Sequence, residues 1–223
     1  MAGQDLVIFN WTVTPLVDLA QQIAERGGTR RPAVVGIDGH SSSGKTTLAT
    51  QLAGLLPSSS VLHTDDLAWH HGVFSWDRLL IDDVLPVVRS GVALNYRPPA
   101  WQGRGRPGAV ELPGNLLWLV VEGVGASQPS VRGDLDVVLW VETDQPTRLA
   151  RDAARVAAGE ISADSYRGWM AEEYAYVVAH RPWEHADLII DGGEAAQSDR
   201  NSQLVVAERW RDRAGGHSDL KVP

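Results

Sequence analysis

The sequence predicts an α/β fold in which a five-stranded parallel sheet is covered by helices on both faces. Short, almost continuously apolar segments alternate with helical patterns along the 223 residues, as parallel strands and their crossover helices require. A loop of small residues joins the first of these apolar segments to a helix. No internal repeat interrupts the pattern. We therefore expect a single domain over residues 1–214 and a disordered polar tail over 215–223.

The predicted elements follow in chain order. Buried strands are expected over 33–37, 61–62, 116–121, 135–141 and 188–190. Apolar periodicity together with glycine and proline positions predicts helices over 16–26, 45–56, 76–89, 146–158 and 163–179. Residues 95–114 are rich in Pro, Gly and Arg, which predicts a long functional loop. A last helix is expected over 204–213.

Composition limits the classes of partner. The formal net charge of −8 argues against a nucleic-acid backbone as the main partner, because such binders carry a basic surface. No apolar run approaches the roughly 18 residues of a membrane helix, and residues 1–10 lack a signal-peptide pattern. The lack of cysteine excludes disulfides and thiolate metal sites. We expect a cytoplasmic protein with a small-molecule partner, no nucleic acid, no membrane, and a possible homo-oligomeric state.

Residues 39–46 read Gly-His-Ser-Ser-Ser-Gly-Lys-Thr and match the phosphate-loop motif G-x-x-x-x-G-K-[ST] at every fixed position. The glycines let the backbone curl so that successive N–H groups point at phosphates, and the following helix adds the positive end of its dipole. Lys45, with an exposed side chain, is expected to reach the β- and γ-phosphates, and the Thr46 hydroxyl to ligate Mg²⁺. The predicted contacts to ATP are Gly39, Ser41, Ser42, Ser43, Gly44, Lys45, Thr46 and Thr47.

Aspartates follow two of the predicted strands. Asp65 and Asp66 come after the strand expected beside the phosphate-loop strand, at the edge where the γ-phosphate should lie. Asp65 is the candidate base that accepts the proton of an attacking hydroxyl, and Asp66 is a helper or a cap. Asp38 ends the phosphate-loop strand, where it either caps the turn, which we favour, or holds a metal-bound water.

Three arginines share one face of a predicted helix. Arg148, Arg151 and Arg155 are spaced i, i+3 and i+7. Such a face can close over ATP phosphates and stabilise the charge that develops during phosphoryl transfer. The alternative is a solvated face whose arginines pair with neighbouring acidic side chains.

With these residues in place, the chain resembles the uridine kinase and phosphoribulokinase-like group of P-loop kinases, from about residue 32 to 191. Beyond the phosphate loop and Asp65, the matching residues are Trp76, Asp77, Gly91, Glu122-Gly123, Arg148, Arg151, Asp152 and Ala186-Asp187. The resemblance implies a P-loop NTPase fold of nucleoside/nucleotide-kinase type with a lid helix. It also implies that Glu122 contacts Mg²⁺, which makes Thr46, Asp65 and Glu122 the metal candidates.

The predicted reaction transfers the γ-phosphoryl group of ATP to a hydroxyl of a small molecule. The catalytic candidates are Lys45, Asp65, Arg148 and Arg151. The acceptor-binding candidates are Asp65, Trp69, Asp77, Tyr96, Trp101, Arg104 and Arg155.

A nucleoside such as uridine or cytidine is the leading acceptor. Uridine kinases hold the pyrimidine with a Tyr and, soon after, a His in the loop that corresponds to 96–106. In this chain the position of that Tyr falls near Pro99 and no His follows, so Tyr96 and Trp101 are the candidate substitutes, whereas the arginines suit an anionic acceptor. The alternatives are a sugar phosphate, a pantothenate-like compound or an antibiotic as acceptor, or a non-catalytic nucleotide-binding regulator. His63, His70 and His71 match no metal-ligand spacing and are expected to be solvent-exposed.

Overall fold

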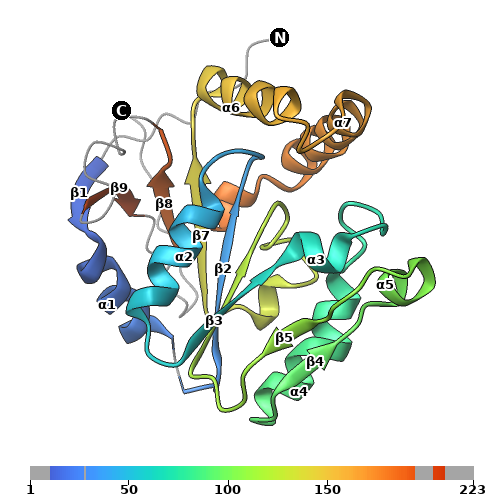
Figure 1. Cartoon of the computed structure of the whole chain (residues 1–223). Helices are drawn as coiled ribbons and strands as arrows, with labels where there is room; N and C mark the ends of the chain where they lie inside the picture. The colour runs from blue at the N-terminus through green and yellow to red at the C-terminus, as the bar shows by residue number, and fades with distance from the viewer. Residues whose placement is uncertain (1–10, 28, 194–202, 209–223) are drawn as a thin grey trace.

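In the computed structural model, which describes residues 11–27, 29–193 and 203–208, a seven-stranded sheet with the order β1-β9-β8-β7-β2-β6-β3 forms the centre of the molecule (Figure 1). Neighbours among five strands pair in parallel, and these strands are β2 Ala33–Gly39, β3 Ser59–His63, β6 Trp118–Glu122, β7 Val137–Glu142 and β8 Leu188–Asp191. The five predicted parallel strands are therefore present. Two antiparallel strands extend the sheet at one edge: β9 Gln203–Glu208 pairs with β8, and β1 Trp11–Pro15 pairs with β9.

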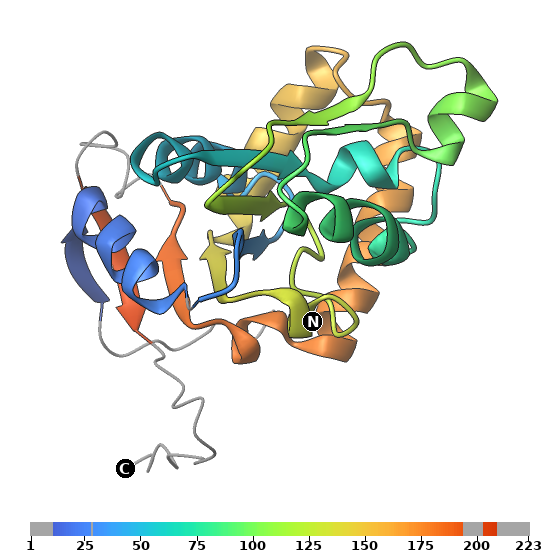
Figure 2. The ribbon, with the colours of Figure 1, turned by 90° about the horizontal axis from the view of Figure 1, so that it is seen from below.

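Helices cover both faces of the sheet (Figures 1 and 2). The α-helices are α1 Leu16–Arg26, α2 Lys45–Leu55, α3 Thr64–Ala68, α4 Leu85–Arg89, α5 Pro99–Arg104, α6 Gln145–Ala157 and α7 Ala163–His180. The π-helical segment η1 Leu79–Val84 leads into α4, and short 3₁₀ turns occur at η2 Arg132–Asp134 and η3 Pro182–His185. No helix of the described residues is both long and apolar enough to cross a membrane.

Strand β2 is buried along its whole length, and its side chains alternate between the two layers of the core. Val35 belongs to the apolar cluster that includes α1 and α2, whereas Val34 belongs to the cluster that includes η1, α4 and α7. Two carboxylates fix the starts of neighbouring strands: Asp136 accepts the Val34 N–H at 2.8 Å, and Asp187 accepts the Val138 N–H at 2.8 Å. This burial on both faces is the reason that the parallel strands read as apolar runs in the sequence.

Three predicted elements need correction. The expected loop over 95–114 contains a hairpin, β4 Leu94–Tyr96 and β5 Val110–Leu112, with α5 between its strands. Its anchors are apolar side chains, such as Trp101, that are spaced too sparsely to give a periodic signal. The prediction of a helix over 204–213 is wrong for residues 204–208, because 203–208 forms strand β9. Residues 209–213 and the predicted tail lie outside the described residues. Strand β1 was not predicted.

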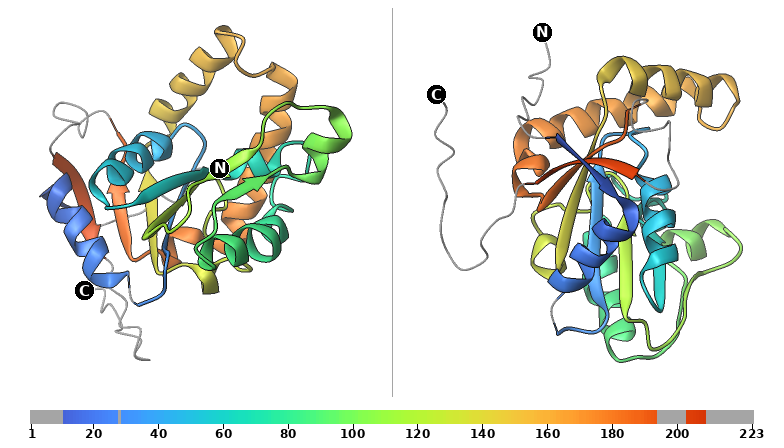
Figure 3. Two further views of the ribbon diagram at one scale, coloured as in Figure 1. Left: turned by 60° about the horizontal axis from the view of Figure 1, so that its bottom comes forward. Right: turned by 90° about the vertical axis from the view of Figure 1, so that its left-hand side faces the viewer.

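The carboxyl ends of the parallel strands meet beneath two helices. Figure 3 shows α6 and α7 crossing this edge of the sheet, above the loop between β2 and α2. The β4–β5 hairpin and α5 lie to one side of the sheet in Figure 2. The described fold thus brings the phosphate-loop motif, the end of β3 and the arginine-bearing helix α6 to one edge, where ligands bind in open α/β sheets.

Candidate active site

The phosphate-loop motif connects the end of β2 to the start of α2. Gly39 approaches neighbouring chain so closely that a Cβ there would lie 2.6 Å from the Val141 carbonyl oxygen. Gly44 caps α2 with a φ of 101°, a left-handed conformation that favours glycine. Both fixed glycines of the motif therefore have a structural reason, one of space and one of backbone conformation.

Lys45 is buried rather than exposed, which corrects the expectation from the sequence. Its side chain is folded over its own loop, where Nζ donates to the His40 carbonyl oxygen at 2.6 Å and only 7% of the residue is accessible. Burial lowers the pKa of Lys45, and the negative charges of Glu122 and Glu173 oppose that shift. The ammonium group therefore already has a protein acceptor, which a phosphate would have to replace.

The three metal candidates lie together at the ends of β3 and β6 and the start of α2. The Thr46 hydroxyl donates to Glu122 Oε1 at 3.2 Å, and Asp65 is close enough for Glu122 to raise its pKa. Two carboxylates and a hydroxyl are hard oxygen ligands, which fit Mg²⁺ when substrate phosphates and waters complete its shell. No group of three or more His, Asp or Glu side chains in the described residues could hold a metal ion by itself.

His63 also contacts this group. Its Nδ1 lies 2.5 Å from Glu122 Oε1, so the ring is half-buried instead of fully exposed as expected. The hydrogen bond to Glu122 raises the pKa of His63, burial opposes the shift, and the charges of Glu122, Asp66 and Asp65 reinforce it. His63 ends β3 and Glu122 ends β6, so the pair follows from parallel register, in which these two residues are partners.

Asp65 lies in the first turn of α3 and lines the pocket, within reach of solvent. Surrounding protein atoms remove part of its hydration, and this burial, together with the charge of Glu122, raises its pKa; Lys45 and Arg155 oppose the shift. A carboxylate with a raised pKa is a better proton acceptor near neutral pH. The geometry and charge of the site therefore suit a general base.

The other two aspartates have structural contacts. Asp38 is fully buried and accepts hydrogen bonds from the N–H groups of Gly39, Gly125 and Ser127 and from the hydroxyls of Ser127 and Tyr176. Asp66 forms an ion pair with Arg106 at 2.8 Å, and its carbonyl oxygen accepts from the Trp101 indole. Neither aspartate lines the pocket. The preferred interpretation of Asp38 as a cap of the turn agrees with its partners.

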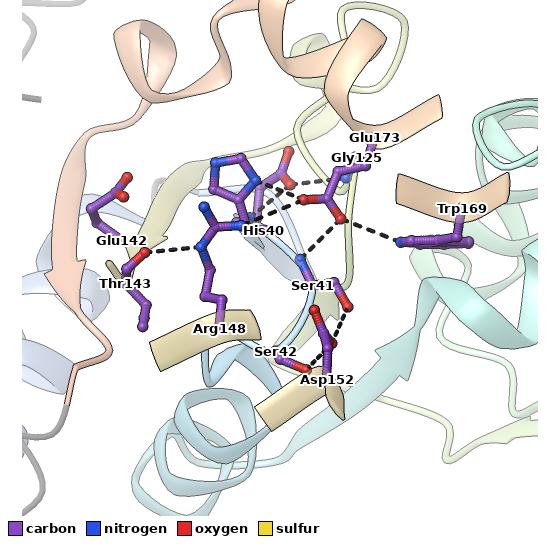
Figure 4. Close-up of polar contacts among 12 residues, drawn as sticks. His40, Ser41, Ser42, Gly125, Glu142, Thr143, Arg148, Asp152, Trp169 and Glu173 are labelled. Atoms are coloured by element: carbon purple, nitrogen blue, oxygen red, sulfur yellow. Dashed lines mark hydrogen bonds and ion pairs between the residues drawn. The ribbon is translucent and has the colours of Figure 1, made fainter. Parts of the chain in front are cut away.

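Lid helix α6 is bonded to the phosphate loop. Arg151 donates to the carbonyl oxygens of Ser42 and Gly192, each at 3.0 Å. Asp152, 1% exposed, accepts from the hydroxyls of Ser41 at 3.2 Å and Ser42 at 2.5 Å. Arg148 donates to the Thr143 carbonyl oxygen at 2.9 Å (Figure 4). Arg148 and Arg151 thus contact backbone carbonyl groups of the loop and its surroundings. Arg155 instead pairs with the exposed Glu160 at 3.2 Å, as the alternative of a solvated face predicts.

A pocket of about 1030 Å³ lies between the phosphate loop, α3, α6 and α7. Every predicted phosphate-loop contact except Gly39 lines it, as do Asp65, Trp69, Glu122, Arg151 and Arg155. Aromatic and apolar side chains form a further wall of the pocket, and its members are Ala68, Trp69, Val73, Ile161, Tyr166 and Trp169. The polar residues His70, His71 and Ser165 also line the pocket. One pocket therefore holds the nucleotide-binding motif, the candidate base and an aromatic surface.

Besides Gly39, five predicted site residues do not line this pocket. Trp101 is buried beneath the Arg106 guanidinium, which stacks 3.5 Å from its ring centroid. The Tyr96 hydroxyl donates to Asp83 at 2.6 Å. The remaining three are Asp77, Arg104 and Arg148. Roles for these residues in binding stay predictions, and they require contacts other than those of the described pocket.

Helix α7 contributes residues that sequence reasoning missed. Tyr166 and Trp169 line the pocket, and Glu173, 1% exposed, accepts from the Ser41 N–H at 3.0 Å. These three occupy positions i, i+3 and i+7, so they share one face of the helix. The spacing was visible in the sequence, but nothing in it indicated that this face would meet the phosphate loop, more than 120 residues earlier.

No family model and no curated protein matches this sequence. Solved structures do match. A possible uridine kinase from Bacillus stearothermophilus aligns with a TM-score of 0.51 and 24% identity, covering 78% of this chain and 96% of that one. A protein provisionally assigned as a fructose transport system kinase, from Silicibacter sp. TM1040, aligns with a TM-score of 0.51 and 20% identity over 68% and 86% of the two chains. The YGR205w protein aligns with a TM-score of 0.50 and 13% identity over 87% and 99%.

These likenesses agree with the overall fold described above. Because all three identities are below 25%, the likenesses show the fold only. The reaction has to be inferred from the residues of the site. The chain has a central, mostly parallel sheet flanked by helices, and its fold is that of the uridine kinase-like and related P-loop kinases.

Proposed function

We propose that this protein is an ATP-dependent kinase that transfers the γ-phosphoryl group to a hydroxyl of a small molecule. The observation that carries the proposal is the presence of a complete phosphate-loop motif and of Asp65, a carboxylate with a raised pKa, on the walls of one pocket. A protein that only binds nucleotide needs the loop but has no use for a base beside it. The kinase names of the structural neighbours support the same class of reaction.

In the proposed reaction the acceptor hydroxyl gives its proton to the Asp65 carboxylate while its oxygen forms a bond to the γ-phosphorus. The bond between that phosphorus and the β–γ bridging oxygen breaks, and ADP leaves. The enzyme's part is mainly to position the two substrates and to stabilise the charge on the transferring group. Asp65 supplies the proton acceptor for this step, which is general-base catalysis.

The nucleotide side of the site depends on Lys45 and Arg151. Their positive charges lie at the loop, where they can neutralise the phosphates once these replace the protein carbonyls that they now contact. Thr46, Glu122 and Asp65 would hold Mg²⁺, which, when bound, neutralises phosphate charge and orients the γ-phosphoryl group. Arg155 lines the same pocket and can approach the transferring group from α6.

A neutral acceptor with a flat ring, such as a nucleoside, remains our leading candidate. Trp69, Tyr166 and Trp169 line the pocket and can stack on a ring. Arg106 is occupied by Asp66 and Trp101, and Arg104 does not line the pocket, which weakens the case for an anionic acceptor held by that segment. A sugar phosphate, a pantothenate-like compound or an antibiotic would need Arg155 for its anionic or polar groups.

The test is ADP formation from ATP and Mg²⁺ with a panel that represents each acceptor class: uridine, cytidine, fructose, a sugar phosphate, pantothenate and a hydroxylated antibiotic. Acceptor-dependent turnover is expected, and Asp65→Asn should lower kcat by about 10²- to 10⁴-fold. Asp82→Asn is the matched control, because this exposed aspartate makes only a 3.9 Å ion pair with Arg78 among its described contacts. Tight ATP binding without turnover on any acceptor would favour the nucleotide-binding regulator instead.

A further inference from the structure

A buried carboxylate from helix α7 joins two parts of the pocket. Glu173 is 1% exposed, and each of its oxygens has a defined partner (Figure 4). Oε1 lies 2.6 Å from His40 Nδ1, whereas Oε2 accepts from the Ser41 N–H at 3.0 Å and from the Trp169 indole Nε1–H at 3.3 Å. One side chain thus contacts two consecutive residues of the phosphate loop and one residue of the aromatic wall.

The charge on Glu173 is maintained by these partners. Burial acts to raise its pKa, but the hydrogen bonds from His40 and Ser41 and the nearby positive charge of Lys45 outweigh burial, and the pKa is lowered. Arg148 adds a further cation, with Nη1 4.0 Å from Oε1. Hydrogen bonds to an ionised, buried acceptor are about twice as strong as those between neutral groups. Glu173 can therefore hold the start of the phosphate loop in one orientation.

Ser41 and Trp169 share the same carboxylate oxygen, and both line the pocket. A phosphate that draws the Ser41 N–H away from Oε2 alters the hydrogen bond to the Trp169 indole at the same atom. Trp169 belongs to the wall that faces an acceptor under the proposed function. A change in the contacts of the phosphate loop can therefore reach the Trp169 indole through one shared oxygen, without any movement of the sheet.

We propose that Glu173 is a positioning residue that couples the phosphate loop to Trp169, so that nucleotide binding sets the shape of the acceptor wall. The proposal rests on the proposed function in that the wall receives the acceptor, but the coupling itself requires only nucleotide. Because linkage is reciprocal, the acceptor strengthens nucleotide binding by the same factor as nucleotide strengthens acceptor binding. Couplings of this kind amount to roughly 5- to 150-fold in affinity.

The experiment follows the indole N–H signals of the full chain labelled with ¹⁵N-tryptophan, with MgADP as the probe and Trp169→Phe to assign the Trp169 signal. In the wild type, MgADP is expected to shift the Trp169 signal. In Glu173→Ala the shift should be lost, because Ser41 and Trp169 then share no acceptor. Glu173→Gln should restore most of the shift, because the amide oxygen can accept from Ser41 and Trp169 while its N–H₂ group faces His40. Glu172→Ala, on the exposed side of the same helix, is the matched control and should behave as the wild type.

The outcomes separate this proposal from the proposed function. A Trp169 signal that stays in place while MgADP saturates the wild type would overturn the coupling and leave the kinase proposal standing. Glu173→Ala with a lowered melting temperature but an unchanged Trp169 shift on MgADP binding would reduce Glu173 to a structural residue and also overturn it. If the wild type does not bind MgADP at millimolar concentration, both proposals fall. The wild-type titration requires only the Trp169→Phe assignment and not Glu173→Ala, so the coupling can still be overturned if Glu173→Ala fails to fold.

Discussion

Replacing Asp38 by Asn should destabilise the fold while leaving catalysis intact. Asp38 Oδ1 accepts from the N–H groups of Gly39 and Gly125, and Oδ2 accepts from the N–H and hydroxyl of Ser127 and from the Tyr176 hydroxyl. An amide nitrogen placed at Oδ1 would leave two backbone N–H groups without an acceptor. An amide nitrogen placed at Oδ2 would leave only the Ser127 N–H group without an acceptor, since the hydroxyls of Ser127 and Tyr176 can rotate and accept. Asn should therefore adopt the second orientation.

The expected cost follows from that single orphaned donor. A buried N–H group without a partner costs about 1–3 kcal/mol. For a domain of this length, 1 kcal/mol corresponds to about 2–4 °C in melting temperature, so the loss should be about 2–12 °C. Because Asp38 does not line the pocket, kcat measured well below the melting temperature should remain within about a factor of three, a difference of less than 0.7 kcal/mol in the barrier.

The assay is a pair of measurements on purified Asp38→Asn and Asp65→Asn: thermal unfolding by circular dichroism, and kcat for the best acceptor of the panel. The two variants should show opposite patterns, with stability lost in the first and turnover lost in the second. An Asp38→Asn protein that keeps the wild-type melting temperature but loses kcat by about 100-fold or more would assign the base to Asp38 and refute the reasoning.

Three further predictions concern the pocket and its flank. Lys45→Met keeps the buried stem but not the charge, so kcat should fall by about 10²- to 10³-fold with a small change in melting temperature. Because the pKa of Asp65 is raised, kcat should fall as the pH drops through that raised value. The folded state also holds this proton more tightly than the unfolded chain, so stability decreases as the pH rises, and Asp65→Asn should melt no lower than the wild type at neutral pH. Arg106→Gln should lower the melting temperature by about 2–4 °C through loss of its Asp66 pair and Trp101 contact, whereas Arg104→Gln should not change it.

The phosphate loop and the parallel strands were predictable because their signals are local. A motif of eight consecutive residues specifies the loop, since each fixed position has its own backbone or charge requirement. Strand β2 is buried on both faces, so its residues 33–37 form one apolar run. The residues that define each of these elements are neighbours in the sequence, so a local pattern is enough to predict the element.

The antiparallel strands β1 and β9 and the β4–β5 hairpin were missed for the opposite reason. The 203–208 segment has the apolar run Leu-Val-Val-Ala, which fits a helix or a strand, and only pairing with β8 and β1 decides between them. The β4–β5 hairpin has three residues in each strand, too few for alternation to stand out among Pro, Gly and Arg. Both depend on partners distant in the chain, which a single sequence does not identify.

The exposure of Lys45 was mispredicted for a related reason, and this bears on how the site works. The sequence indicated donors for phosphate, but in the fold these donors have protein acceptors: Lys45 contacts the His40 carbonyl, Ser41 contacts Glu173, and Arg151 contacts the Ser42 carbonyl. Phosphate binding must exchange each acceptor for another, so only the difference between the two sets of bonds contributes to affinity. Since Arg151 lies on the lid helix α6 and Glu173 on α7, we expect that exchange to weaken the contacts of both helices with the loop. Nucleotide affinity and lid position are then linked, and a change that weakens the lid contacts should alter both.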